Sequence, residues 1–179
     1  MKKISSFLIT SFMAIALSGC LGDKTQTDST LQSSGSELSS AKARIKTIHG
    51  DIVFAFYPDK APNTVKRISE LIKEGFYDGL IFHRVVAGFV VQGGDPTGTG
   101  RGGSGKKLKA EFSDLKHEKG SVAMARSMDV DSADSQFYIA LNPAPHLDGQ
   151  YTIFGKVVEG IDTLDKIVQG DKMISVSLE

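Results

Sequence analysis

The sequence predicts an all-β domain, built either as a closed barrel or as a sandwich. Short runs of β-branched and aromatic residues recur from residue 43 onward, and Gly, Pro, Asn or Asp separate them at short intervals. Only two segments have the spacing of amphipathic helices. Both all-β arrangements protect strand edges from solvent. With 179 residues, 40% of them hydrophobic, the chain can build one ordinary core but not several domains.

The first twenty residues have the composition of a targeting segment. Lys2 and Lys3 precede an apolar run over 4–17, which is shorter than the about 20 residues of a membrane-spanning helix. The run ends in Leu17-Ser18-Gly19-Cys20, which resembles a bacterial lipobox. On this interpretation residues 1–19 are a lipoprotein signal peptide, and cleavage leaves Cys20 with lipid, palmitate included, on its sulfur and amine. The alternative is an ordinary cleaved signal with an incidental cysteine.

A lipid-modified Cys20 places the protein in the bacterial cell envelope, held to a membrane surface without spanning it. Leu21 follows the cysteine, where an aspartate is associated with retention at the inner membrane. We therefore expect the outer membrane, facing the periplasm, if the organism has two membranes. In an organism with one membrane we expect the outer face of that membrane.

Composition and motif spacing exclude several classes of function. Cys20 is the only cysteine, so neither an intrachain disulfide nor a multi-thiolate zinc site is possible. Without Lys2 and Lys3 the chain has 19 basic against 21 acidic side chains, which gives no electrostatic case for a nucleic-acid partner. No H-x-x-x-H pair and no G-x-S-x-G motif occurs. We expect no metal and no cofactor.

Residues 20–42 comprise the lipidated cysteine and a tether rich in Ser, Thr, Gln and Gly, a composition typical of flexible segments. The folded domain is expected over 43–179. It opens with two β-type runs over 44–48 and 52–57, joined at His49-Gly50-Asp51, which predict a hairpin. Ala61-Pro62-Asn63 then precede an amphipathic helix over 64–74, and Gly75 follows its last turn.

The rest of the domain reads as short strands with one more helix. Strands are predicted over 80–86, 89–92, 121–125, 136–141, 152–158 and 173–178, and a second short helix around 161–169. Alternation in the fourth of these runs places Gln136 and Tyr138 on one face and Phe137 and Ile139 on the other.

The segment from Gly93 to Gly105 contains patterns that resemble phosphate-binding loops. Residues 98–103 have dinucleotide-type glycine spacing, and residues 100–106 nearly form a P-loop. A P-loop lysine is followed by Ser or Thr, but Lys107 stands at that position, and no helical pattern follows the glycines. We therefore interpret the glycines as loop residues that adopt backbone conformations other residues reach with difficulty.

Seven sequence blocks, taken together, resemble the cyclophilin family of peptidyl-prolyl cis/trans isomerases. In order they are Phe82-His83-Arg84, Gly88-Phe89, Gln92-Gly93-Gly94-Asp95, Met124-Ala125, residues 134–139, residues 146–149 and residues 154–157. The resemblance covers residues 44–179, and such a match is more specific than any single motif. It implies a closed eight-stranded antiparallel β-barrel capped by two α-helices. It also implies an enzyme that isomerises X-Pro bonds in proline-containing polypeptides.

The same resemblance implies which residues form the site. The catalytic set is Arg84, Phe89 and Gln92, with Arg84 as the main catalytic residue. Further substrate contacts are expected from Val90, Ala125, Arg126, Gln136, Tyr138, His146, Leu147 and Tyr151. His146 stands where the best-known eukaryotic members have a tryptophan that donates a hydrogen bond to cyclosporin, so we expect weak inhibition by that drug. Val90, Arg126, Tyr138 and Tyr151 also differ from that pattern.

The leading hypothesis is thus a membrane-tethered prolyl isomerase for proteins that fold in the envelope, with a monomer as the default state. A second hypothesis is a non-catalytic chaperone or scaffold that binds peptides on the same fold. A third, a β-barrel lipoprotein that carries a small ligand, predicts none of the blocks. Taken singly, Phe89, Val90 and Leu147 are also consistent with plain core, and Arg84 with a surface salt bridge.

Overall fold

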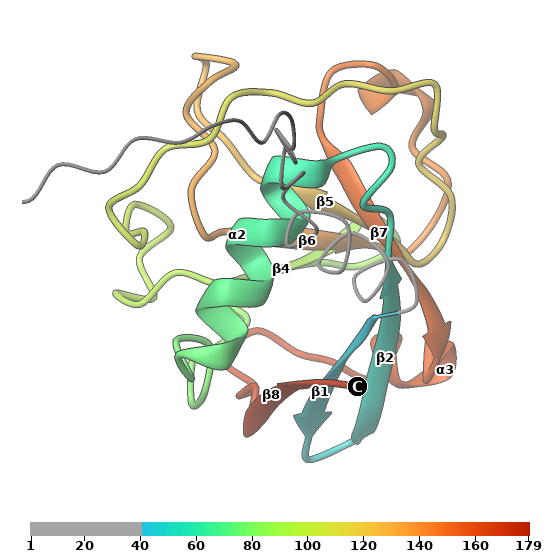
Figure 1. Cartoon of the computed structure of the whole chain (residues 1–179). Coiled ribbons are helices and arrows are strands. Elements are labelled where there is room, and N and C mark those ends of the chain that lie inside the picture. Colours follow the sequence, from blue (N-terminus) through green and yellow to red (C-terminus); the bar gives the residue numbers. More distant parts are fainter. Residues whose placement is uncertain (1–40) are drawn as a thin grey trace, which may run out of the picture.

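The computed structural model describes residues 41–179, in which eight antiparallel strands form one strongly curved sheet (Figure 1). The strands are β1 (Lys42–Thr47), β2 (Gly50–Phe56), β3 (Arg84–Val86), β4 (Val90–Gly93), β5 (Ser121–Met124), β6 (Phe137–Ala140), β7 (Ile153–Glu159) and β8 (Ser175–Leu178). Their order across the sheet is β3-β4-β6-β5-β7-β2-β1-β8. The predicted all-β fold is confirmed. The signal peptide, Cys20 and nearly all of the predicted tether lie outside the described residues.

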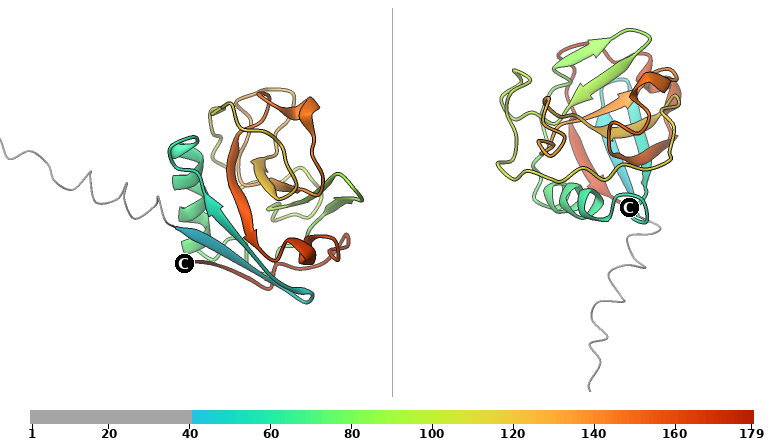
Figure 2. Two further views of the ribbon diagram at one scale, coloured as in Figure 1. Left: turned by 90° about the vertical axis from the view of Figure 1, so that its right-hand side faces the viewer. Right: turned by 90° about the horizontal axis from the view of Figure 1, so that it is seen from above.

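The sheet closes on itself less completely than the word barrel implies. Its edge strands, β3 and β8, do not pair with each other. The segments just before them do: the Phe82 N–H donates to the Asp171 carbonyl at 2.8 Å, and the Met173 N–H donates to the Leu80 carbonyl at 2.8 Å. The run predicted as one strand over 80–86 is therefore regular strand only in β3, since its first half forms this irregular seam. The prediction of a closed barrel was slightly too strong (Figure 2).

Helix α2 (Pro62–Lys73) lies along one side of the sheet and covers the core with Val65, Ile68, Leu71 and Ile72. Proline occupies its first turn, where a missing N–H leaves no hydrogen bond unmade. A carboxylate that is distant in sequence caps the helix. Glu111 accepts hydrogen bonds from the N–H groups of Asn63 and Thr64 at 3.0 and 2.8 Å.

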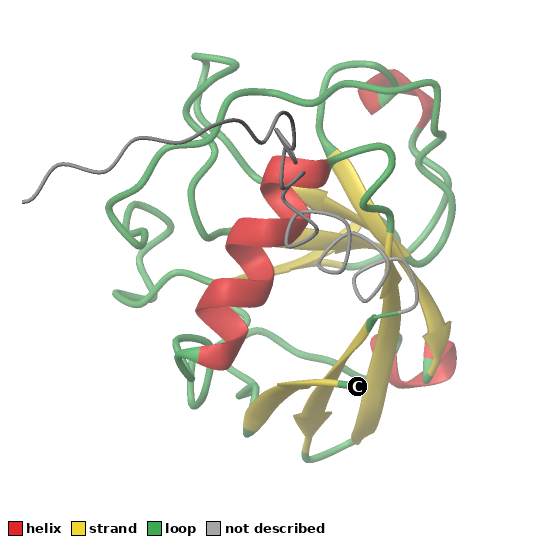
Figure 3. Cartoon of the chain, viewed as in Figure 1, coloured by secondary structure: helices red, strands yellow, loops and turns green. Residues whose placement is uncertain are grey.

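The second predicted helix is present but shorter than expected. Helix α3 spans only Ile161–Leu164 and lies away from α2, beside β2 (Figure 3). Beyond it, the N–H groups of Lys166 and Ile167 bond to carbonyls three residues back, at Thr163 and Leu164. This tighter bonding is typical of a frayed last turn, so the periodic pattern over 161–169 overestimated the helix.

The central strands β5 and β6 bury both of their faces, and the predicted alternation along β6 is confirmed. Phe137 and Ile139 of β6 point into the main core, which also contains Phe54, Val91 and Phe154. Tyr138 points the opposite way, into a smaller cluster with Val90, Ala123 and Ile153. Full burial of one large apolar side chain contributes about 1.5–3 kcal/mol, so both clusters resist a change in strand register.

Two glycines with nearly the same backbone conformation allow the cost of backbone strain to be distinguished from the cost of a steric clash when a Cβ is added. Gly79 has φ +76° and Gly160 has φ +78°; a Cβ on Gly79 would meet no atom within 4 Å, whereas one on Gly160 would lie 2.0 Å from the Asp51 carbonyl oxygen. We expect Gly79→Ala to lower the free energy of unfolding by about 1–2 kcal/mol through strain alone.

For Gly160→Ala we expect a further loss of about 1–3 kcal/mol, because the β2 backbone must move. Urea titration of both variants measures the difference. Equal urea midpoints for the two variants would contradict the conclusion that residue 160 lies too close to the β2 backbone to accept a Cβ.

Candidate active site

The register of the sheet places the predicted site residues in one row across neighbouring strands. Arg84 of β3 lies opposite Gln92 of β4, Gln92 lies opposite Tyr138 of β6, and Tyr138 lies opposite Ala123 of β5. Directly opposed residues point to the same face of a sheet, with Cβ atoms about 4.5–5.5 Å apart. The row therefore runs from an exposed arginine at the sheet edge to a buried apolar floor.

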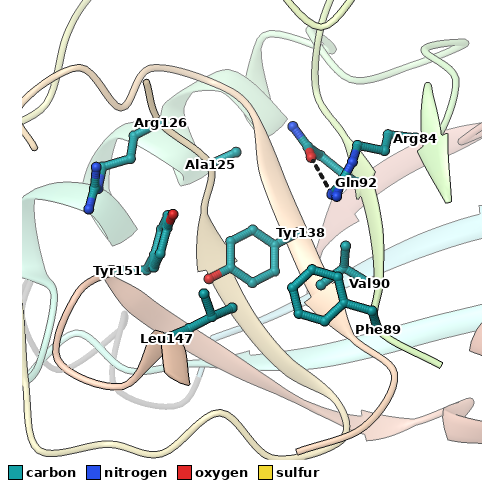
Figure 4. A pocket seen from close by; sticks show the side chains of 9 residues that line it. All are labelled: Arg84, Phe89, Val90, Gln92, Ala125, Arg126, Tyr138, Leu147 and Tyr151. Atoms are coloured by element: carbon teal, nitrogen blue, oxygen red, sulfur yellow. Dashed lines mark hydrogen bonds between the residues drawn. The ribbon is translucent and has the colours of Figure 1, made fainter. Parts of the chain in front are cut away.

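A pocket with a volume of about 180 Å³ opens over this row (Figure 4). Phe89, Val90, Tyr138 and Leu147 provide apolar surface, while Arg84 and Gln92 form one rim. The full lining is Arg84, Phe89, Val90, Gln92, Ala125, Arg126, Tyr138, Leu147 and Tyr151. The pocket thus combines an apolar floor with hydrogen-bond donors on one side, a common composition of sites for small apolar groups.

A chain of amide hydrogen bonds holds the Arg84 guanidinium. Arg84 Nη1 donates to Gln92 Oε1 at 3.3 Å, Gln92 Nε2 donates to Gln136 Oε1 at 3.0 Å, and Gln136 Nε2 donates to the Gly102 carbonyl at 2.8 Å. Each of the two glutamines accepts a hydrogen bond with its amide oxygen on the side of Arg84 and donates one with its amide nitrogen on the side of Gly102. The donors of the chain therefore all point in one direction. It orients Arg84 without a carboxylate.

A buried histidine links two walls of the pocket. The Asp148 carboxylate accepts hydrogen bonds from His117, at 2.8 Å from the backbone N–H and at 3.0 Å from Nδ1. A carboxylate can only accept, so in the neutral ring Nε2 accepts the Tyr138 hydroxyl at 2.9 Å. Burial raises the pKa of Tyr138 far above its ordinary value, which keeps the hydroxyl protonated. Tyr138 on the floor and the loop that carries Leu147 are thereby fixed to each other.

Two buried carboxylates fix the glycine-rich loop beside the site. Burial alone would raise the pKa of Asp95, but donors from Thr97, Gly102 and Gly100 outweigh it and lower that pKa to about 2. Asp134 accepts hydrogen bonds from the Ser104 N–H and hydroxyl, both at 2.6 Å. The loop therefore wraps carboxylates of the protein itself, which excludes the phosphate-binding alternative on structural grounds.

A second pocket, with a volume of about 400 Å³, adjoins the first. The two share Gln92, Ala125 and Arg126. The second pocket is lined in addition by Gly100, Arg101, Gly102, Lys107, Ser127, Ser132, Asp134 and Gln136. Sequence reasoning did not assign Arg101 and Lys107 to a site. The only available signal was a positive charge within the glycine-rich loop, at Arg101, and another just after it, at Lys107.

The structure brings nine of the eleven predicted site residues into the first pocket and places two elsewhere. Gln136 lines the second pocket and reaches the first through its bond to Gln92. His146 is exposed at the edge, where its ring stacks on Phe89 with centroids 5.6 Å apart, and it does not line either pocket. His117 and Asp148 were not predicted as site residues, and neither lines the first pocket.

Comparison with known proteins identifies the family. Residues 42–176 match the profile of the family described as "Cyclophilin type peptidyl-prolyl cis-trans isomerase/CLD". A peptidyl-prolyl cis-trans isomerase of Helicobacter pylori is 49% identical over 140 residues, which are 76% of this chain and 85% of the relative. Peptidyl-prolyl cis-trans isomerase B of Bacillus subtilis is 47% identical over 130 residues, 72% of this chain and 90% of the relative.

A solved structure agrees with the sequence relatives. The crystal structure of a Cryptosporidium parvum cyclophilin type peptidyl-prolyl cis-trans isomerase, determined in the presence of the dipeptide Ala-Pro, is similar with a TM-score of 0.73 and 32% identity. The match covers 77% of this chain and 98% of the solved one. The family profile, the sequence relatives and the fold agree, and this chain belongs to the cyclophilin-type peptidyl-prolyl cis-trans isomerases.

Proposed function

We propose that the isomerase acts on X-Pro bonds in extended segments of polypeptides, with Arg84 as its main catalytic residue, and that it works while anchored to a membrane of the bacterial envelope. The observation that carries the catalytic part is the state of Arg84. A neutral amide, Gln92, holds its guanidinium at the rim of an apolar pocket. Within residues 41–179, no carboxylate pairs with it.

The chemistry needs a donor and a dry pocket rather than a nucleophile. Rotation about the X-Pro bond breaks amide resonance, with a barrier of about 18–20 kcal/mol, and no bond is made or cut. In the twisted amide the proline nitrogen regains its lone pair and becomes a better acceptor. A guanidinium that donates more strongly to this nitrogen than to the planar amide lowers the barrier. Arg84 stays charged at any ordinary pH.

The apolar floor suits a proline ring in particular. Phe89, Tyr138 and Leu147 enclose the space, and proline brings no N–H that would need a partner there. Gln92 lies beside Arg84 and can hold a substrate carbonyl through its amide. The crystal structure of the Cryptosporidium parvum relative in the presence of Ala-Pro supports a proline-containing peptide as ligand.

The competing proposal is a protein that binds peptides on the same surface without turnover. Both proposals use the apolar pocket, but only catalysis requires an unneutralised donor over it. Arg84 is exposed and oriented by hydrogen bonding, which favours catalysis over simple binding.

The envelope location is supported by sequence alone. Cys20 ends a segment with the features of a lipoprotein signal, and the family match begins at residue 42, after the proposed tether. Within residues 41–179, no helix has the length and apolar character needed to cross a bilayer. We propose that lipid on Cys20 holds the enzyme at a membrane, facing the periplasm on the outer membrane where two membranes exist.

Replacing Arg84 tests the catalytic proposal. We expect Arg84→Ala to lower kcat/KM for a short Ala-Pro peptide about 10²–10³-fold, the usual effect of removing a charged donor from a transition state. NMR exchange between cis and trans peptide, with the purified full chain, measures the rate directly. Lys46→Ala, which removes an exposed cation of β1, is the control and should keep the full rate.

If Arg84→Ala keeps the kcat/KM of the parent chain, Arg84 is not the main catalytic residue. An intact chain that binds the peptide without accelerating exchange would favour the chaperone or scaffold proposal instead.

The link between His117 and Tyr138 predicts a loss of stability in Tyr138→Phe. This change removes only the hydroxyl and leaves Nε2 of a fully buried imidazole without a partner, which costs about 1–3 kcal/mol. Tyr57→Phe is the matched control, because the Tyr57 hydroxyl makes no hydrogen bond to any residue of 41–179. Thermal unfolding compares the two. If Tyr138→Phe is as stable as Tyr57→Phe, the hydrogen bond to His117 does not stabilise the pocket.

Cys20→Ser tests the anchor. Expressed in a bacterium with radiolabelled palmitate, the parent chain should carry the label and sediment with membranes, whereas the variant should do neither. Label of equal strength in both chains would refute lipidation at Cys20.

A further inference from the structure

The arginines of this chain fall into two groups by their partners. Away from the pockets, Arg44 pairs with Asp51 at 2.9 Å and Arg67 pairs with Glu70 at 3.6 Å. The other three, Arg84, Arg101 and Arg126, all line the two pockets. None of these three has a carboxylate within 4.0 Å in the part of the chain that the structure describes. All of the unneutralised guanidinium charge is thus collected around one surface.

The acidic and basic groups of the second pocket do not balance. Asp134 is its only carboxylate, is 5% exposed, and already accepts three hydrogen bonds from Ser104 and Gly105. Lys107 pairs with it at 3.5 Å, which cancels one cation. Arg101 and Arg126 remain as two net positive charges on the pocket wall.

Hydrogen bonds fix Arg126 without neutralising it. Its guanidinium lies over the Tyr151 ring, 4.6 Å from the centroid, and donates to the carbonyls of Gln150 at 3.0 Å and Ser127 at 2.8 Å. Carbonyl oxygens satisfy N–H groups but carry no net charge. The cation is therefore held in place with its electrostatic attraction intact.

The loop that carries Arg101 is equally well defined. The Gly102 carbonyl accepts from Gln136, and the Asp95 carboxylate accepts from the Gly100 N–H, so both neighbours of Arg101 are tied to the framework. The side chain itself is exposed. Arg101 thus offers its charge from a fixed backbone.

We propose that Arg101 and Arg126 select substrates in which an acidic side chain lies within three residues of the proline, with the proline in the first pocket and the carboxylate in the second. The two pockets share three residues and therefore adjoin each other, and three residues of an extended chain span about 10 Å, so a peptide with its proline in the first pocket can place a nearby side chain in the second. The inference rests on the proposed function, and it adds a substrate class to it.

The test compares peptides that differ in one residue. A short Ala-Pro peptide carries Glu, Gln or Lys at one position, scanned from three residues before the proline to three after it. NMR exchange with the full chain gives kcat/KM for each peptide without a coupling protease. At one or more positions we expect Glu to exceed Gln by about 2- to 10-fold and Lys to fall below Gln, with smaller differences at high salt, as for exposed charge pairs.

Substitutions of Arg101 and Arg126, with a matched control, test whether these two arginines cause the preference for Glu over Gln. Arg101→Gln should reduce the ratio of the Glu rate to the Gln rate, and the double change Arg101→Gln with Arg126→Gln should bring it close to one. Lys46→Gln removes the same charge from β1, remote from both pockets, and should leave the ratio unchanged.

Equal rates for Glu and Gln at every position, with the Gln peptide still catalysed, would overturn the selection of acidic substrates and leave the isomerase intact. A preference for Glu that the double variant keeps would overturn the assignment to Arg101 and Arg126. Failure to catalyse any of the peptides would overturn the proposed function itself, and this inference with it.

Discussion

The site depends on one constraint, the pairing register of β3, β4, β6 and β5. This register aligns Arg84, Gln92, Tyr138 and Ala123 as direct neighbours on one face. The intervening residues, such as Val91 and Ile139, fill the main core on the other face. A slip of one residue would exchange the two sets and bury Arg84 among apolar side chains. The same packing that stabilises the fold therefore fixes the relative positions of the donor and the apolar floor.

Loops complete the pocket, and buried carboxylates hold them through hydrogen bonds. Asp95 and Asp134 hold the glycine-rich loop, and the His117–Asp148 pair holds the segment that carries Leu147. Buried polar groups need partners, so each carboxylate orders the backbone N–H groups around it. Preorganisation matters for the proposed mechanism, because a donor that must reorganise during rotation would lose part of its effect.

The sequence predicted what local periodicity and ordered motifs can encode. Alternation in 136–141 placed Tyr138 opposite to Phe137 and Ile139, as observed, and nine of the predicted site residues meet in one pocket. Non-local geometry escaped prediction: the seam between Leu80 and Met173, the cap that Glu111 gives to α2, and the second pocket around Arg101 all join segments distant in sequence. Helix α3 was overestimated because apolar spacing does not distinguish an α-helix from a tighter final turn.

The contrast between Arg44 and Arg84 shows how one residue type serves two purposes on this sheet. Arg44 pairs with the carboxylates of Asp51 in the β1–β2 hairpin and of Glu179 beyond β8. These two ion pairs join the hairpin to the last residue and neutralise the Arg44 charge. Gln92 holds Arg84 with a neutral amide, and a second amide, Gln136, holds Gln92. An isosteric glutamate at position 92 would provide the same oxygen but would neutralise the cation before substrate arrives. An amide chain orients the guanidinium and leaves its charge available, which is the combination that the proposed stabilisation of a developing lone pair requires.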